Sequence, residues 1–219
     1  MKLLEKENCF LIEDFFENSI VAGFTKPVLQ GDVLKDIPKI ACLKDFKIVF
    51  LEQIHSATVH RVQEGRLLEG DGLITDKPGI VCVVRTADCM PVFLSSEERN
   101  VTGVIHMGWR GAKLGILDNI GYDLQSFKAI AGCGMRQCCY EVGKEFLNYQ
   151  EFKPSLKEKN NSLYFNPADF IKRRLEANGL KKDNFLDLNI CSICSKENFY
   201  SFRRNATDFR TLSFIVRAK

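Results

Sequence analysis

Long apolar runs are missing from this chain of 219 residues. No stretch approaches the roughly 18 consecutive apolar residues that indicate a membrane-spanning helix. Residues 1–17 contain Glu5, Lys6 and Glu7 among their apolar side chains, so this segment lacks the continuous apolar core of a secretory signal peptide. The sequence therefore predicts a cytoplasmic protein that does not enter a membrane.

A strong charge bias is also absent. Lys and Arg number 31 against 28 Asp and Glu, which gives a net charge of +3, and aromatic residues are not interleaved with basic runs as they are in single-strand binders. We expect no nucleic-acid partner. The 45% hydrophobic and 27% charged residues are typical of globular proteins, and the length suits one domain, residues 1–219.

Several common catalytic signatures are not present. The sequence has no Gly-rich dinucleotide fingerprint, no phosphate loop that ends in Gly-Lys-Ser/Thr, no Gly-x-Ser-x-Gly elbow and no His-Glu-x-x-His pair. Thiols and imidazoles are the remaining candidates for chemistry, from nine cysteines and only three histidines. An odd number of cysteines without an export signal predicts reduced thiols rather than a disulfide framework.

Short β-type runs are what the chain has in abundance. Apolar and β-branched residues gather in runs bounded by Gly, Pro and polar clusters. We expect residues 153–162 to form a polar loop and residues 199–203 an extended segment. Many strands with few helices predict the α+β class. The expected strands cover residues 10–12, 20–24, 48–51, 73–75, 80–84, 90–95, 101–106, 128–131, 186–190 and 211–216.

Two segments have the spacing of amphipathic helices. The first covers residues 112–124, where leucine and isoleucine recur every three or four positions. The second begins at Asn166, a capping residue that precedes Pro167 at the first helical position, and ends at Gly179. Its apolar stripe consists of Phe170, Ile171 and Leu175.

One stretch, residues 72–111, contains the most suggestive pair of side chains. Residues 90–95 and 101–106 are apolar runs separated by a polar cluster, which predicts a β-hairpin. A turn centred between Glu97 and Glu98 would place Cys89 opposite His106, with Cβ atoms about 5 Å apart. That separation suits two metal ligands or a catalytic pair.

His55 also follows an expected buried strand. Two imidazoles and one thiolate around a tetrahedral ion leave one position open, as in catalytic zinc sites. From spacing alone, a core cysteine with histidines that bond the backbone is an equal alternative. His60 is expected to point to solvent.

The late cysteines form two close-spaced pairs, Cys138-Cys139 and Cys191-x-x-Cys194. Such pairs suggest a structural zinc site or a redox pair. Neither pair is followed by a second Cys-x-x-Cys or by neighbouring histidines in the sequence, so inert thiols are the favoured interpretation.

Several blocks resemble the bacterial laccase-domain proteins, a family once labelled polyphenol oxidase and now described as purine nucleoside phosphorylase with adenosine deaminase activity. The blocks include the Thr-Ala-Asp-Cys-x-Pro and His-x-Gly-Trp-Arg-Gly motifs, in order and at the family's spacing. The chain departs from the family pattern where Ser56 replaces a glycine. The similar blocks are QIHSATV (53–59), EGDGLITDKPGIVCVVRTADCMPVFL (69–94), VIHMGWRGAKLGIL (104–117), CCYEVG (138–143) and FYSFRR (199–204).

The resemblance implies that His55, Cys89 and His106 bind zinc, with copper an alternative ion in vitro. It implies cleavage of inosine, guanosine, adenosine or methylthioadenosine by phosphate, and possible adenosine deamination. With it we expect a mixed β-sandwich flanked by helices, in a four-layer α/β/β/α arrangement.

Phosphorolysis needs cations that hold phosphate, a task that suits the planar guanidinium group. Arg110 and either Arg203 or Arg204 are the candidates, each with the alternative of a surface or structural ion pair. Asp88 is the candidate for proton transfer in deamination, with zinc-activated water attacking C6 of adenine. Alternatively, Asp88 only orients its turn.

Two other activities use the same side chains. Cys89 as nucleophile and His106 as base would make an amidohydrolase, and the resemblance implies peptidoglycan precursors as its substrates. A copper-dependent phenol oxidase is less suited, because a multicopper centre needs many imidazoles and the chain has three histidines. A single copper near Met90 or Met107 is conceivable, but could not carry out four-electron reduction of oxygen.

Overall fold

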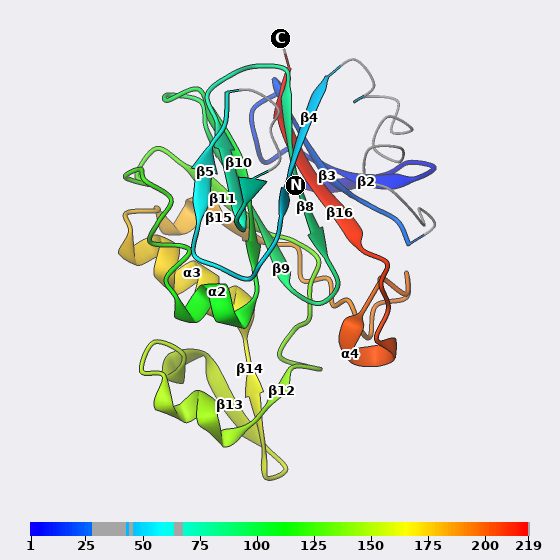
Figure 1. Ribbon diagram of the computed structural model, residues 1–219, viewed down its shortest axis with the longest axis vertical. Helices are drawn as coiled ribbons and strands as arrows, with labels where there is room; N and C mark the ends of the chain where they lie inside the picture. Colours follow the sequence, from blue (N-terminus) through cyan, green and yellow to red (C-terminus); the bar gives the residue numbers. More distant parts are fainter. Residues whose placement is uncertain (28–42, 44–45, 64–67, 219) are drawn as a thin grey trace.

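The computed structural model describes residues 1–27, 43, 46–63 and 68–218. Its main body is a pair of β-sheets (Figure 1). One sheet has seven strands in the order β1 (Lys2–Glu5), β2 (Cys9–Glu13), β3 (Ile20–Thr25), β16 (Thr211–Arg217), β8 (Ile80–Thr86), β4 (Lys47–Glu52) and β6 (Leu68–Glu69). The other has six, in the order β15 (Phe185–Asp187), β11 (Lys128–Ala131), β9 (Met90–Ser96), β10 (Val101–Met107), β7 (Gly72–Thr75) and β5 (Val59–Arg61).

The central strands β8, β9 and β10 are buried on both faces along almost their whole length. In β9, Phe93 packs in the layer between the sheets, whereas its neighbours Val92 and Leu94 pack on the outer face. This alternation follows from the two-residue period of a strand. It explains why the sequence shows continuous apolar runs here instead of a polar and apolar alternation.

Helices cover the outer face of the six-stranded sheet. Helix α3 (Pro167–Ala177) packs its buried Phe170, Ile171 and Leu175 there, together with residues around the short helix α2 (Trp109–Lys113). As predicted, Asn166 caps α3 by accepting a hydrogen bond from the backbone N–H of Asp169. The α+β class and the single-domain sandwich are confirmed. The second helical layer of the expected four is not among the described residues.

The predicted helix over residues 112–124 is wrong. Helix α2 ends at Lys113, and Gly115 and Gly121 follow with φ of 82° and 77°, left-handed values that interrupt a helix. Leucine and isoleucine recur because Leu117, Ile120 and Leu124 are buried in successive turns. None of the described helices is long and apolar enough to span a membrane.

Residues 153–162 are not a loop but lead into a β-hairpin. A short 3-10 helix, η3 (Lys153–Ser155), precedes β13 (Leu156–Lys159) and β14 (Ser162–Phe165), which pair antiparallel. The two asparagines between the strands have φ of 51° and 60°, as a type I′ turn requires. Strands β13 and β14 form a small third sheet with β12 (Glu141–Val142) at one end of the molecule's long axis (Figure 1). The 3-10 helix η2 (Lys144–Asn148) follows β12.

The end of the chain also differs from the prediction. The expected extended segment 199–203 turns into helix α4 (Phe202–Asn205), capped by the Ser201 side chain, which accepts from the N–H of Arg204. The expected strand 186–190 ends at Asp187 in β15, after the 3-10 helix η4 (Lys182–Asn184).

The predicted hairpin of β9 and β10 exists, but in another register. His106 pairs with Pro91, and Met107 with Met90, so Cys89 does not lie opposite His106. The turn occupies residues 97–100 and is closed by a hydrogen bond from Asn100 N–H to the carbonyl of Glu97. The register differs by two residues, and an even difference keeps each side chain on its predicted face.

Candidate active site

The site lies where the chain passes from one sheet to the other. Strands β4 and β6 run parallel, as do β4 and β8, so the carboxyl ends of all three lie at the same end of the seven-stranded sheet. Each is followed by a crossing to the six-stranded sheet, and the crossings contain His55, Asp71 and Cys89 in turn. His106 joins them from β10, because its backbone N–H donates to the carbonyl of Asp71 at 2.7 Å.

His55, Cys89 and His106 converge on one point. Their ligand atoms all lie within 4.8 Å of one another, and Cys89 Sγ is 3.8 Å from His55 Nε2. Tetrahedral zinc, with a Zn–S bond of about 2.3 Å and a Zn–N bond of about 2.0–2.1 Å, would hold sulfur and nitrogen about 3.6 Å apart. The donor set therefore fits a zinc-sized ion with one coordination position left over.

Asp71, which the sequence analysis missed, contacts two of the three donors. Its side chain is fully buried, and it accepts hydrogen bonds from His106 Nδ1 at 2.7 Å and from the backbone N–H of His55 at 3.0 Å. The hydroxyl of Ser56 donates to it at 2.7 Å. This arrangement directs His106 Nε2 away from the carboxylate, in the pattern of a carboxylate that orients a metal-binding histidine. An acidic residue between two glycines, directly before a buried strand, was the available signal.

Charge interactions explain how Asp71 tolerates burial. Burial alone would raise the pKa of the Asp71 carboxyl, but hydrogen bonds from His106 and Ser56 outweigh it and lower that pKa below its usual value. Asp71 is therefore ionised at neutral pH.

In the protein without metal, the Cys89 thiol and the His106 imidazole shift each other's pKa. Burial opposes ionisation of Cys89, yet the positive charge and hydrogen bond of His106 lower the pKa of the thiol to about 6. Burial likewise opposes protonation of His106, but the Cys89 thiolate and Asp71 raise its pKa to about 9. A thiolate and an imidazolium thus face each other at neutral pH, and a metal ion binding there would displace the imidazolium proton.

The backbone at this site is strained and crowded. His55 and Asp88 have φ of 58° and 87°, which non-glycine residues rarely adopt and which are typical of functional sites. Gly108 leaves room for the ligands, because a Cβ at that position would lie 3.0 Å from both Cys89 Sγ and His55 Cδ2. These features indicate that the local fold is adapted to bring the donors together.

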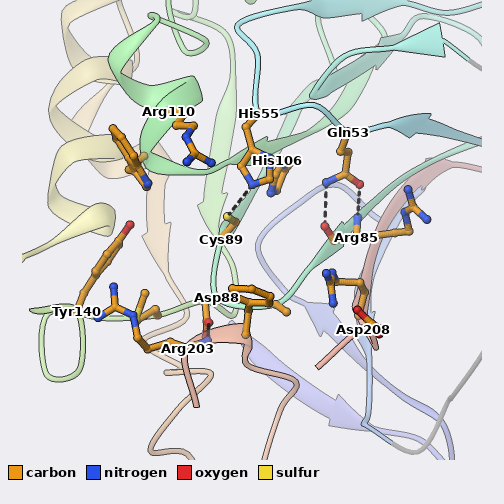
Figure 2. Close-up of a pocket in the computed structure, with 15 residues that line it drawn as sticks. Gln53, His55, Arg85, Asp88, Cys89, His106, Arg110, Tyr140, Arg203 and Asp208 are labelled. Atoms are coloured by element: carbon orange, nitrogen blue, oxygen red, sulfur yellow. Dashed lines mark hydrogen bonds between the residues drawn. The ribbon is translucent and has the colours of Figure 1, made fainter. Parts of the chain in front are cut away.

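A cavity of about 590 Å³ opens onto the three donors. Figure 2 shows the donors at the centre of the residues that line it, with Arg110 and Arg203 on one side and Arg85 on the other. A hydrogen-bond pair between the Gln53 side chain and the Arg85 backbone, at 2.8 and 2.7 Å, fixes that second side. The arginines and aromatic residues of the lining are Arg85, Arg110, Arg203, Arg210, Trp109, Tyr140 and Phe202.

Of the three predicted arginines, two line the cavity and one does not. Arg110 lines the cavity and stacks on Trp109, and within the described residues its guanidinium has no hydrogen-bond or ion-pair partner. Arg203 also lines the cavity, beside the Tyr140 ring, and donates to the Glu141 carbonyl. Arg204 instead bonds backbone carbonyls, including those of residues 193 and 199, and so has a structural role. The sequence analysis did not identify Arg85 and Arg210.

Asp88 lies in the wall of the cavity, and hydrogen bonds hold its carboxylate in place. One oxygen accepts from the Ser192 hydroxyl at 2.7 Å, and the other from the backbone N–H of Arg203 at 2.7 Å. Asp88 therefore links the ligand-bearing crossing to the segment that carries Arg203.

The other singled-out side chains lie outside this cavity. His60 bonds the Glu69 carbonyl at 2.8 Å from strand β5 and takes no part in the site. The late cysteines gather in a second group, and three of them, Cys138, Cys191 and Cys194, line a different cavity.

Comparison with known proteins identifies the family. Residues 34–218 match the family model described as multi-copper polyphenol oxidoreductase laccase. The chain belongs to this family. The resemblance seen in the sequence is thus confirmed.

Relatives in this family include proteins named purine nucleoside phosphorylase. The one from Aquifex aeolicus is 40% identical over 157 residues, which cover 68% of this chain and 71% of that protein. The one from Borreliella burgdorferi is 30% identical over 174 residues, which cover 72% and 74%.

Solved structures share the fold. YlmD from Geobacillus stearothermophilus superimposes with a TM-score of 0.88 at 22% identity, covering 99% of this chain and 98% of that one. The hypothetical protein YfiH from Bacillus licheniformis gives 0.87 at 23% identity, with 98% of both chains covered.

Proposed function

We propose that this protein is a zinc-dependent purine nucleoside phosphorylase that cleaves inosine, guanosine, adenosine or methylthioadenosine with phosphate. The observation that carries the proposal is one cavity that combines a three-donor metal site with arginines and aromatic rings. The names of the relatives support the same activity. We further propose a cytoplasmic location, in keeping with these substrates.

The arginines in the cavity suit phosphate. The Arg110 guanidinium has no hydrogen-bond or ion-pair partner among the described residues and is available to an anion, and Arg203 lies on the same side of the cavity, with its backbone N–H bonded to Asp88. Guanidinium groups form paired, charge-assisted hydrogen bonds with phosphate oxygens. In the proposed reaction a phosphate oxygen forms a bond to C1′ of the ribose while the bond from C1′ to the purine nitrogen breaks. The bonding electrons leave with the base, which then takes up a proton.

The aromatic side chains suit the nucleoside. Trp109, Tyr140 and Phe202 line the same cavity, and flat aromatic faces bind nucleobases by stacking. Burial raises the pKa of the Tyr140 phenol above its usual value, so its hydroxyl stays neutral and able to donate a hydrogen bond.

His55, Cys89 and His106 would hold the zinc ion, which would supply Lewis acidity next to the substrate. Asp71 fixes the orientation of His106 and the His55 loop, and so keeps the donors in place. Asp88, oriented by Ser192 and Arg203, is the proposed proton-transfer group for a secondary adenosine deaminase activity.

A second candidate function rests on a specific arrangement. Cys89, His106 and Asp71 also form the thiol, imidazole and carboxylate series of a cysteine hydrolase, with the thiolate and imidazolium charges described above. An amidohydrolase acting on peptidoglycan precursors would use this series without metal. A metal-bound thiolate is a poor nucleophile, so the two functions compete for the same sulfur.

The test measures inosine cleavage with and without phosphate, together with zinc content, for the wild type and Cys89→Ser. We expect cleavage that depends on both phosphate and zinc. Loss of an ion that contributes several kcal/mol should lower kcat/KM about 100-fold or more in Cys89→Ser. A chelator should abolish cleavage, and added zinc should restore it. Cleavage that survives metal loss would contradict the proposal, and chelator-resistant amide hydrolysis would support the alternative.

Arg110→Ala tests the phosphate site. Losing a charge-assisted hydrogen bond worth about 1.5–3 kcal/mol should lower kcat/KM for phosphate about 10- to 100-fold. The zinc content should not change. Arg99→Ala, an exposed turn residue outside the cavity lining, is the matched control. Equal kcat/KM for phosphate in the two variants would show that Arg110 does not bind phosphate.

A further inference from the structure

Four cysteines from two distant segments meet at the surface. Cys138 and Cys139 lie between β11 and β12, and Cys191 and Cys194 lie between β15 and α4. Their four sulfur atoms all lie within 4.8 Å of one another. The expectation of inert, separate thiols relied on the absence of a second Cys-x-x-Cys in the sequence, but folding supplies the partner pair.

The spacing of the sulfurs matches coordination rather than cross-linking. Cys138 Sγ and Cys194 Sγ are 3.6 Å apart. Tetrahedral zinc with four Zn–S bonds of about 2.3 Å would separate the sulfurs by about 3.8 Å, whereas a disulfide needs about 2.05 Å. The four thiols thus already stand close to the geometry of a tetrathiolate site.

The backbone around the thiols is ordered by its own hydrogen bonds. A parallel bridge joins Gly134 to Cys191, and the N–H of Ser192 donates to the Gly134 carbonyl at 3.0 Å. Tight turns place each pair, with Cys139 N–H donating to the Arg136 carbonyl at 2.8 Å and Ser195 N–H to the Cys191 carbonyl at 3.2 Å. Each pair is thus placed by its own turn, and the backbone bridge brings the two pairs together.

We propose that Cys138, Cys139, Cys191 and Cys194 bind a second zinc ion, which has a structural role. Four thiolates complete a tetrahedral shell and leave no position for substrate, as in structural zinc sites. Soft thiolate ligands favour zinc over magnesium, calcium or manganese.

The ion would stabilise one wall of the active-site cavity. Tyr140, which lines that cavity, directly follows Cys139. Between the other two ligands, Ser192 donates its hydroxyl to Asp88 at 2.7 Å. Tying the two segments together therefore fixes Tyr140 and Asp88 relative to each other, although no ligand of this ion lines the active-site cavity.

The experiment measures zinc per chain in protein purified under reducing conditions. We expect two zinc ions in the wild type and one in each of Cys138→Ser and Cys194→Ser, whose side chains are exposed. Cys82→Ala, which removes a core thiol outside both groups, should retain two. Unchanged zinc in the Cys138→Ser and Cys194→Ser variants would overturn the proposal.

A second measurement separates this proposal from the proposed function. In the Cys89→Ser background, cobalt should give the intense ultraviolet charge-transfer bands of four thiolates, and adding Cys194→Ser should abolish them. This readout does not depend on enzymatic activity or on metal at the other site. Absent bands, or a disulfide among the four cysteines in peptide maps of anaerobically purified protein, would overturn the proposal.

Discussion

The two groups of side chains that we propose to bind zinc differ in donors and in surroundings. The site of His55, Cys89 and His106 has three donors of mixed type, a buried carboxylate behind it and a cavity in front of it. The four-thiol group has a full set of like donors, two of them exposed. Three donors leave a position for chemistry, whereas four close the shell. One chain thus carries a site suited to reaction and another suited to stability.

The two groups also differ in how the fold supports them. The first lies where the carboxyl ends of three parallel strands meet at one end of a sheet. The second joins two surface segments through a single backbone bridge. We therefore expect the first site to keep its geometry without metal, and the second to depend more on its ion. The following predictions test this contrast.

Asp71→Asn should have the largest effect on the first site. The amide NH2 would face one of the two sets of groups that now donate to the carboxylate: either His106 and the His55 N–H at one oxygen, or the Ser56 N–H and hydroxyl at the other. Loss of such an orienting partner typically costs about 10- to 100-fold in metal affinity or activity. Zinc titration and inosine cleavage measure it, with the exposed Asp183→Asn as control. The four-thiol group should keep its zinc; loss of both ions would mean that Asp71 supports the whole fold instead.

Gly108→Ala should have a smaller effect at the same site. Its φ of −86° suits any residue, so the only penalty is the close approach of the new Cβ to Cys89 Sγ and His55 Cδ2. Overpacking of this kind costs about 1–3 kcal/mol, and we expect it to appear as weaker zinc binding at this site alone.

Gly121→Ala is the control for backbone effects. That glycine has φ of 77° and open space around it, so the variant should lose thermal stability without losing zinc affinity. Zinc affinity that falls equally in both variants would contradict the crowding argument.

The smallest expected effect is the pH dependence of the thermal stability of the metal-free protein. The lowered pKa of Cys89, about 6, contributes stability that is lost as pH falls through that value. The raised pKa of His106, about 9, contributes stability that is lost as pH rises through that value. The ion pair should therefore stabilise the metal-free protein between about pH 6 and 9, and thermal unfolding should show this in the wild type.

Cys89→Ser should flatten that pH profile. The difference in ultraviolet thiolate absorbance between wild type and variant should titrate near pH 6, whereas burial raises the pKa of the core thiol Cys82 to about 12. A difference spectrum that titrates above pH 8 would contradict the pairing of Cys89 with His106.

Local patterns predicted much of this molecule from the sequence. The β9 and β10 runs, the Asn166 cap and the apolar stripe of α3 follow from residue periodicity and capping, which act over a few residues. The grouping of His55, Cys89 and His106 was also anticipated, because each follows or ends an apolar run.

What the sequence left undetermined depends on contacts between distant segments. The register of the hairpin was wrong by two residues because its turn could be centred at either of two positions in a polar cluster. Asp71 carried no motif, and its role arises only when three strand ends meet. The four thiols come from segments more than fifty residues apart in the chain, as the separation of Cys138 and Cys194 (|i−j| = 56) shows, and no local pattern joins them.

The most direct test of the central claim is anomalous X-ray diffraction at the zinc edge from crystals of the zinc-loaded protein. The account predicts an anomalous peak at bonding distance from Cys89 Sγ and from ring nitrogens of His55 and His106, with His106 Nδ1 still hydrogen-bonded to Asp71. An active protein with no zinc peak among these three side chains would contradict it.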